Sequence, residues 1–231
     1  MAELLKGTGK DETFSLVSDG HWGTYSVARW NGASETVSLK GFNRFYDAVQ
    51  GGGGYDVLQL LSAGDNALLY ADELSPVATS VDVQKRFSGI SEIRGGDGRD
   101  VIDMTALSGA YGNDLLLKGG AGDDVLWAGR GDDVLVGGTG NDDLRGGAGE
   151  DIYLFGMDWG KDTIRDDCGT LVFDNALKRS LAFESLSTGT RIVSGENSVE
   201  VSWVVSETDV HFADVAELSS MRLNTIKTFL A

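Results

Sequence analysis

Four consecutive nine-residue repeats in the middle of the chain constrain its fold more than any other feature. They begin at Gly119 and read GGAGDDVLW, AGRGDDVLV, GGTGNDDLR and GGAGEDIYL. Each follows the pattern G-G-x-G-x-D-x-U-x, in which U is a large apolar residue, except that Ala128 replaces one glycine. Because the aspartate and the apolar residue keep their phase through all four copies, this segment is a repeated structural unit and not a flexible linker.

Weaker copies of the same pattern flank this block on both sides. Two are full matches that stand apart from it, GGGGYDVLQ (51–59) and GGDGRDVID (95–103). Three are partial: LSAGDNALL (61–69), with Asn66 in place of the aspartate, YGNDLLL (111–117), with Gly112 and Asp114, and WGKDTI (159–164), with Gly160 and Asp162. Residues 70–90 read as a long connection or an irregular insertion.

The nine-residue period predicts a parallel β-roll. The first six residues of each unit turn, and the last three form a very short strand. If each strand crosses the roll once, successive turns lie on opposite edges and eighteen residues complete one coil. The apolar eighth positions then point between two sheets and form a thin core, with Leu126, Leu135, Leu144 and Tyr153, extended by Ile102, Leu116 and Ile164.

The same repeats predict bound calcium. Glycine at positions one, two and four leaves room for backbone carbonyls to converge, and the aspartate adds a carboxylate. Calcium takes about six to eight oxygen ligands, so this mixture suits it better than it suits magnesium. We expect several Ca²⁺ ions, each held between stacked turns. The expected metal-binding residues are Asp56, Asp100, Asp114, Asp124, Asp133, Asp142, Asp151 and Asp162, with Gly95, Gly119, Gly129, Gly137 and Gly146.

Stacking of turns two repeats apart predicts which aspartates share an ion. The expected pairs are Asp124 with Asp142, Asp133 with Asp151, Asp114 with Asp133, and Asp142 with Asp162. Each strand buries about one large side chain, which contributes roughly 1.5–3 kcal/mol. Ordering nine residues costs on the order of 10 kcal/mol. We therefore expect the roll to be unfolded or loose without calcium.

The segments around the roll predict antiparallel β-strands and a short C-terminal helix. Alternating Val199, Val201, Trp203 and Val205 lie on one face of a strand, and Asp214 is a candidate helix N-cap. Val215, Leu218, Met221, Ile226 and Phe229 follow at near-helical spacing. Trp127 and Trp159 are expected on the surface of the roll or at its cap.

We expect one all-β, calcium-dependent ligand-binding domain over residues 1–231. Its parts are N-terminal strands (12–50), irregular first repeats with an insertion (51–94), the β-roll (95–165), and C-terminal strands with a helix cap (166–231).

The charge and composition of the chain restrict its partners. It has 36 acidic against 19 basic residues, a formal net charge of −17, which disfavours nucleic acid and favours multivalent cations. Cys168 is the only cysteine, so neither an intrachain disulfide nor a cysteine-based zinc site can form. No window has the length and hydrophobicity of a membrane span, so we expect no membrane insertion. A monomer within a larger chain is expected.

The repeats from about 95 to 164 resemble the RTX repeats of Gram-negative proteins exported by type I secretion. The resemblance implies a protein that is made in low calcium, exported unfolded, and folded outside the cell or on the bacterial surface. The arrangement of strands before and after the roll is also similar to the ligand-binding domains of RTX adhesins, particularly the calcium-dependent peptide-binding domains. That likeness implies an exposed calcium that receives the C-terminal carboxylate of a partner peptide or protein.

Candidate ligand-binding residues lie in the irregular copies and the insertion, where stacking is incomplete. They are Asp56, Asp65, Asp72 and Asp100, each of which is alternatively a structural calcium ligand or a solvated loop acid. A second functional reading is a C-terminal folding and secretion block of a secreted hydrolase or toxin, with no ligand of its own. A third is a carbohydrate-binding module that uses His21, Trp22, Tyr25 and Trp30. The chain has no HExxH or GxSxG motif and only two histidines, so we expect no enzyme.

Overall fold

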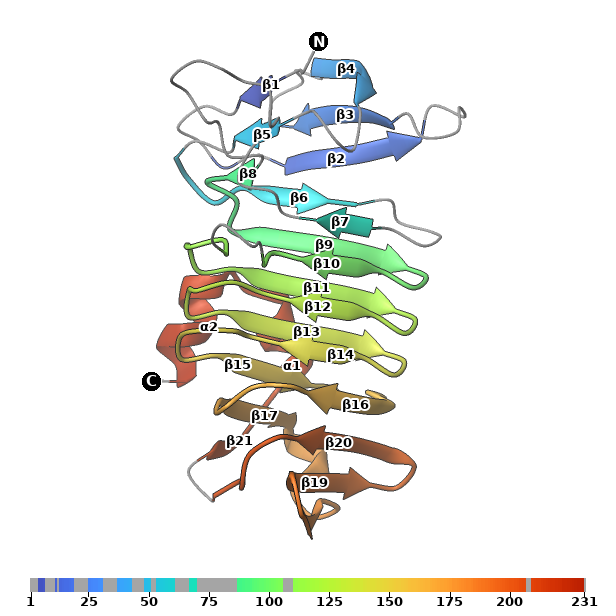
Figure 1. The fold of residues 1–231 in the computed structure, drawn as a ribbon, viewed down its shortest axis with the longest axis vertical. Coiled ribbons are helices and arrows are strands. Elements are labelled where there is room, and N and C mark those ends of the chain that lie inside the picture. The colour runs from blue at the N-terminus through green and yellow to red at the C-terminus, as the bar shows by residue number, and fades with distance from the viewer. Residues whose placement is uncertain are drawn as a thin grey trace.

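The fold, seen in a computed structural model, is a stack of β-coils along the long axis of the molecule (Figure 1). The structure describes residues 4–6, 11, 13–18, 25–30, 37–42, 48–50, 53–60, 67–69, 87–105, 110–206 and 209–230. Almost all of these residues form strands or the turns between them. The predicted all-β fold with a parallel β-roll is confirmed.

Two long sheets form the body of the stack. The ten-stranded sheet has the order β21 (Val210–Ala213), β17 (Thr170–Asp174), β15 (Ile152–Phe155), β13 (Val134–Thr139), β11 (Leu116–Ala121), β9 (Glu92–Asp97), β6 (Val57–Gln59), β2 (Thr13–Ser18), β3 (Tyr25–Trp30) and β4 (Val37–Phe42). The eight-stranded sheet has the order β18 (Ala182–Leu186), β19 (Gly189–Ser194), β20 (Asn197–Val201), β16 (Lys161–Ile164), β14 (Asp143–Arg145), β12 (Val125–Trp127), β10 (Val101–Asp103) and β7 (Ala67–Leu69).

Smaller elements complete the fold. A three-stranded sheet contains β1 (Leu4–Lys6), β5 (Ala48–Gln50) and β8 (Phe87–Ser88). A 3-10 helix, η1 (Asn175–Leu177), follows β17, and two α-helices end the chain, α1 (Val215–Ser220) and α2 (Leu223–Leu230). None of the helices in the described part of the chain is long and apolar enough to cross a membrane.

The strand register confirms the eighteen-residue coil. Leu116 of β11 pairs with Val134 of β13, which pairs in turn with Ile152 of β15. On the other sheet Val125 pairs with Asp143 at the same separation. These pairs are parallel, whereas β2–β3–β4 at one end and β18–β19–β20 at the other are antiparallel, as predicted for the flanks.

Glycine allows successive coils to approach closely at their turns. Gly138 has a φ of 114°, a conformation that residues with a Cβ rarely adopt. A Cβ at this position would also overlap the carbonyl oxygen of Gly120 in the preceding coil. The repeated glycines are therefore required by the spacing between coils as well as by the turn itself.

The core between the two sheets is one side chain thick for most of its length. The predicted apolar residues Ile102, Leu126, Leu135, Leu144, Tyr153 and Ile164 are all buried in it. Towards the C-terminal end the core contains larger aromatic rings, and Phe155 stacks on Phe173 with 4.9 Å between ring centroids. Trp159 packs against both rings and is only 1% exposed. The prediction of a surface position for Trp159 is therefore wrong.

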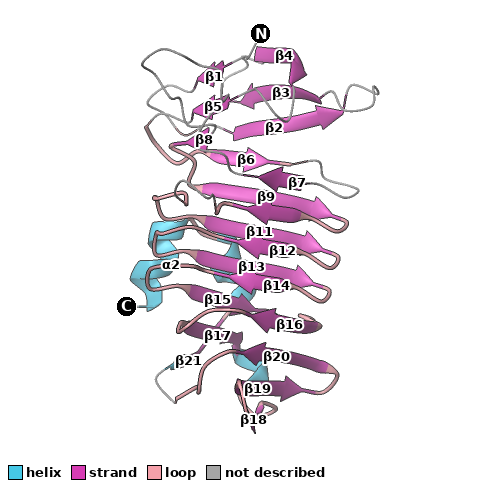
Figure 2. Cartoon of the chain, viewed as in Figure 1, coloured by secondary structure: helices cyan, strands magenta, loops and turns pink. Residues whose placement is uncertain are grey.

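The C-terminal helices cover the outer face of the ten-stranded sheet, as Figure 2 shows. Their buried residues pack in one apolar cluster with side chains of five adjacent strands, and this cluster includes Leu116, Val134, Ile152, Val172, Ala213, Val215, Leu218, Leu223 and Ile226. Asp214 caps α1 by accepting a hydrogen bond from the Glu217 N–H at 2.8 Å, as predicted. The predicted single helix is in fact two, and Phe229 is 62% exposed instead of packed.

The second helix also contacts residues that are far away in the sequence. Arg222 pairs with Asp11 at 2.5 Å, and its guanidinium lies 4.9 Å from the ring centroid of Tyr55. The Leu223 N–H donates to the Tyr55 hydroxyl at 3.3 Å. Helix α2 therefore connects the C-terminal end of the chain to the irregular first repeats.

Two residues of helix α2 test whether this helix packs on the ten-stranded sheet. Ile226 is fully buried against the sheet, so Ile226→Ala should lower the free energy of unfolding by about 2–5 kcal/mol. Phe229→Ala, three residues along the same helix, should change it by less than about 0.5 kcal/mol. Urea unfolding in saturating calcium measures both. Equal losses would contradict the packing described here.

Candidate calcium sites on the two edges of the roll

Four buried aspartates form a continuous row along one edge of the roll. Asp100, Asp124 and Asp142 each directly precede a strand of the eight-stranded sheet, and Asp162 lies at the start of β16. The strand register stacks the four in this order. Each of the first three donates its main-chain N–H to a carboxylate oxygen, Oδ1, of the next, at 2.7, 2.8 and 2.9 Å. The predicted stacking of Asp124 on Asp142 and of Asp142 on Asp162 is therefore observed.

The row on the opposite edge is shorter and interrupted. Asp133 donates its N–H to Asp151 Oδ1 at 2.8 Å, as the predicted pairing requires. Asp56 belongs to the same edge, but the two coils between Asp56 and Asp133 have Ser91 and Leu115 in the aspartate position. The Leu115 N–H still donates to Asp133 Oδ1 at 2.6 Å. The turn geometry thus persists where the carboxylate is missing.

The predicted pair of Asp114 with Asp133 is wrong by one residue. Asp114 stacks instead on Asp132, whose N–H donates to Asp114 Oδ1 at 3.0 Å. Its other oxygen, Oδ2, pairs with Lys227 of α2 at 2.7 Å. The same shift places Leu116 against the C-terminal helices and Leu117 in the inner core, which corrects the predicted core position of Leu116.

A second, exposed row of acceptors accompanies each buried row, and the sequence interpretation missed it. Asp123 accepts from the N–H of Asn141 at 2.8 Å, and Asp132 accepts from the N–H of Glu150 at 2.9 Å. These residues occupy the fifth position of their repeats. The sequence contains a signal for this row, because each of the four consecutive copies has Asp, Asn or Glu at its fifth position.

The second carboxylate oxygen of each buried aspartate points to the glycines of the turn. A Cβ added to Gly119 would overlap Asp124 Oδ2 and would lie 2.6 Å from the carbonyl oxygen of Gly137 in the next coil. Gly137 lies in the same way against Asp142 Oδ2. The space that glycine leaves open is therefore lined by a carboxylate oxygen and a carbonyl oxygen from two different coils.

Two of these carboxylate oxygens have no hydrogen-bond donor in the described part of the chain. Asp124 Oδ2 and Asp142 Oδ2 are buried, and neither accepts a hydrogen bond from the described part of the chain. Burial raises the pKa of Asp124 and Asp133 to about 7, and it raises the pKa of Asp162 to about 8. Neighbouring aspartates raise all three further, while main-chain N–H groups oppose the shift. A bound cation would remove this penalty.

The donor set fits calcium. Among the described residues no three carboxylate, imidazole or thiolate side chains come together, so an ion here must take backbone carbonyls as well as aspartates. Hard oxygen ligands in a flexible arrangement are what Ca²⁺ prefers, whereas Mg²⁺ needs tighter octahedral geometry. Gly95, Gly119, Gly137 and Gly146 all place an aspartate oxygen beside the position that a Cβ would fill, whereas Gly129 packs against the Tyr111 carbonyl.

Two of the four candidate ligand-binding residues lie in the aspartate rows, and the other two lie outside the described residues. Asp56 and Asp100 are fully buried within the two rows. Asp65 and Asp72 lie outside the described residues, as do His21 and Trp22 of the carbohydrate hypothesis. Tyr25 and Trp30 belong to β3, of which only the main chain is described.

A pair of adjacent aspartates tests the calcium role. Asp124→Asn should raise the calcium concentration needed for folding about tenfold or more, because it removes a charged ligand from the buried row. Asp123 is the neighbouring residue, and it is exposed. Asp123→Asn removes the same amount of charge and should change the calcium concentration needed for folding only slightly. Calcium titration followed by far-UV circular dichroism measures both midpoints. Equal shifts would show that surface charge, and not the buried row, attracts the ion.

The stability of the metal-free roll is expected to fall as pH rises. Below about pH 4 the folded and unfolded chains both hold their protons, so burying these aspartates has little cost. As pH rises through the raised folded-state pKa values, about 6 for Asp142 and Asp151 and about 8 for Asp162, the metal-free roll loses stability. Calcium binds the ionised form, so protons compete with it. In EGTA, far-UV circular dichroism should therefore show more β structure at about pH 4 than at pH 8; β structure that does not decrease as pH rises would contradict this assignment.

Comparison with known proteins agrees with this geometry. The family described as RTX calcium-binding nonapeptide repeat (4 copies) matches residues 108–144 and 118–153, which include both rows of aspartates at their most regular. No curated protein matches the chain significantly. Repeats of this family bind several calcium ions and are typical of extracellular bacterial proteins exported by type I secretion. Residues 108–153 of the chain therefore consist of RTX calcium-binding nonapeptide repeats, and they fold as a parallel β-roll.

Proposed function

We propose that this chain is an extracellular binding module, and not an enzyme, which calcium converts from a secretable unfolded polypeptide into a rigid roll. The observation that carries the proposal is the continuous row of buried aspartates, in which Asp124 Oδ2 and Asp142 Oδ2 accept no hydrogen bond from the described part of the chain. Such rows are unstable in low cytosolic calcium. Extracellular calcium modules bind at roughly 0.1–1 mM, so the same chain folds once it is outside.

The interrupted edge is the place in the roll best suited to hold a calcium with an open position. An ion beside Asp56 would have Ser91 in the next coil and Leu115 in the one after, where the regular sites have carboxylates. With fewer protein oxygens, this ion has room for an anionic ligand. Asp100 is a less suitable candidate because it belongs to the uninterrupted row.

A cavity beside this break gives a ligand access. It has a volume of about 370 Å³ and is lined by Tyr55, Ser91, Gly112, Asn113, Asp114, Leu223 and Asn224. Tyr55 directly precedes Asp56, and Ser91 occupies the vacant aspartate position. We propose that the ligand is the C-terminal carboxylate of a peptide or protein on a partner cell, which makes the chain an adhesin module.

The principal alternative is a folding and secretion block that has no ligand of its own. Both functions require the calcium rows, so calcium-dependent folding does not distinguish them. Only the adhesin function requires the interrupted edge to bind a carboxylate. The two are therefore separated by ligand binding in a variant that keeps the uninterrupted row.

A peptide array tests this function. The protein in millimolar calcium should bind a subset of peptides with free C-termini, and it should lose them in EGTA or when the peptides are amidated. Asp56→Asn should weaken this binding about tenfold or more by removing the carboxylate that holds the open ion. Asp97→Asn, an exposed acid on β9, is the matched control and should retain it. If no peptide binds in calcium, the folding block is the correct function.

A further inference from the structure

A second cavity lies at the C-terminal end of the roll, far along the chain from the interrupted edge. Its volume is about 470 Å³, within the range of roughly 300–1,000 Å³ that is typical of small-molecule sites. It is lined by Lys178, Leu181, Phe183, Val205, Ser206, Val210 and Phe212. These residues come from the segment after η1, from β18, from the segment after β20, and from β21. The regular repeats contribute none of them.

The cavity is continuous with the core of the roll. Leu181, Val205, Val210 and Phe212 are partly buried and pack against the inner apolar cluster between the two sheets. The core of a solenoid needs a cap at its end, because the last coil has no neighbour. Here the apolar surface continues outward instead to Phe183, which is 52% exposed on β18. The last coil therefore presents an apolar cavity that an aliphatic group can fill.

A positively charged side chain lines this cavity, although the protein as a whole is strongly acidic. Among the described residues that line it, Lys178 alone is charged, and its ammonium lies 5.6 Å from the ring centroid of Phe212. The nearby Asp209 carboxylate accepts from the N–H and the hydroxyl of Ser206, at 2.6 and 2.8 Å. A ligand that combines an apolar body with one negative charge would match both the lining and the lysine.

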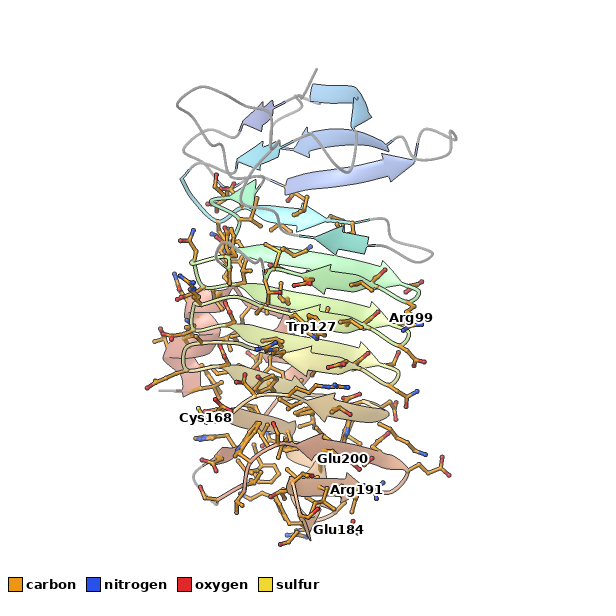
Figure 3. All side chains as sticks on the ribbon, in the orientation of Figure 1. Arg99, Trp127, Cys168, Glu184, Arg191 and Glu200 are labelled. Atoms are coloured by element: carbon orange, nitrogen blue, oxygen red, sulfur yellow. The ribbon has the colours of Figure 1, made fainter. Side chains whose placement is uncertain are left out.

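The outer face of the same hairpin has the opposite character. Glu184, Arg191 and Glu200 follow one another across β18, β19 and β20, as Figure 3 shows, and the arginine lies within 3.8 Å of both acids. Two acids against one base give this face a net negative charge. An anionic amphiphile is therefore favoured at the cavity over the adjacent outer face of the sheet.

We infer that this cavity binds an aliphatic carboxylate of the fatty-acid type, with its chain against Phe183, Val205 and Val210 and its carboxylate at Lys178. This site is independent of the proposed peptide site, because it contains no aspartate of either row. It needs calcium only to keep the roll folded.

Octanoate is the test probe, and 1-octanol is its uncharged counterpart. In calcium-saturated protein, octanoate should shift the methyl NMR signals of Leu181, Val205 and Val210 in a saturable way. Calorimetry should show that octanoate binds at least about threefold more tightly than 1-octanol, as expected for one partly screened ion pair. The site is overturned if octanoate does not bind, if it shifts only signals near the interrupted edge, or if both probes bind equally.

Substitution of either of two neighbouring basic residues tests which positive charge octanoate contacts. Lys178→Ala should weaken octanoate binding about threefold to fivefold and leave 1-octanol binding unchanged. Arg179→Ala removes the same charge from the next residue, which does not line the cavity, and should affect neither probe. Both side chains are exposed, so both variants should fold, and circular dichroism in calcium verifies it. Equal effects of the two variants would also overturn the proposal.

Discussion

Repulsion between buried carboxylates is the constraint on which the rest of this structure depends. Two unit charges about 5 Å apart repel by roughly 3 kcal/mol at an effective dielectric constant of about 20, and each row repeats such contacts. Burial adds a desolvation penalty, which is why the pKa of Asp162 rises to about 8. A cation between the coils relieves both effects. We therefore expect the glycine turns, the short strands and the thin core to fold stably only when that cation is bound.

The two edges meet this constraint in different ways. The row from Asp100 to Asp162 is continuous, so each interior coil can share ions with both neighbours. On the other edge Leu115 replaces the carboxylate, and helix α2 lies beside the gap. There the ammonium of Lys227 lies 2.7 Å from Asp114 and 3.9 Å from Asp132. A side-chain cation thus compensates acids of successive coils in the part of the roll where metal ligands are fewer.

The sequence predicted the coil and most of the buried rows because their phase is unbroken from residue 119 to 154. It failed at Asp114, because the pairing of Leu116 with Val134 places Asp114 at the fifth position of its coil and Leu115 at the sixth. The covering helices were predicted only as a cap. A further clue was present in the seventh positions, where Val134 and Ile152 are apolar but Asp143 is not. The contacts of α2 with Asp11 and Tyr55 could not be predicted, because no local pattern encodes a contact between such distant residues.

The contact between Leu223 and Tyr55 also has a kinetic consequence. These residues are 168 positions apart, and closing so long a loop in a disordered chain has a large entropic cost. Stacked coils shorten the path between them, because each coil advances the chain by only one strand spacing of about 4.8 Å. The contact is therefore most favourable after the intervening coils have formed. In this order of events the contact of α2 with Tyr55 forms last and only on a stack of the correct length. A missing or extra coil would place Tyr55 too far from Leu223 for their hydrogen bond.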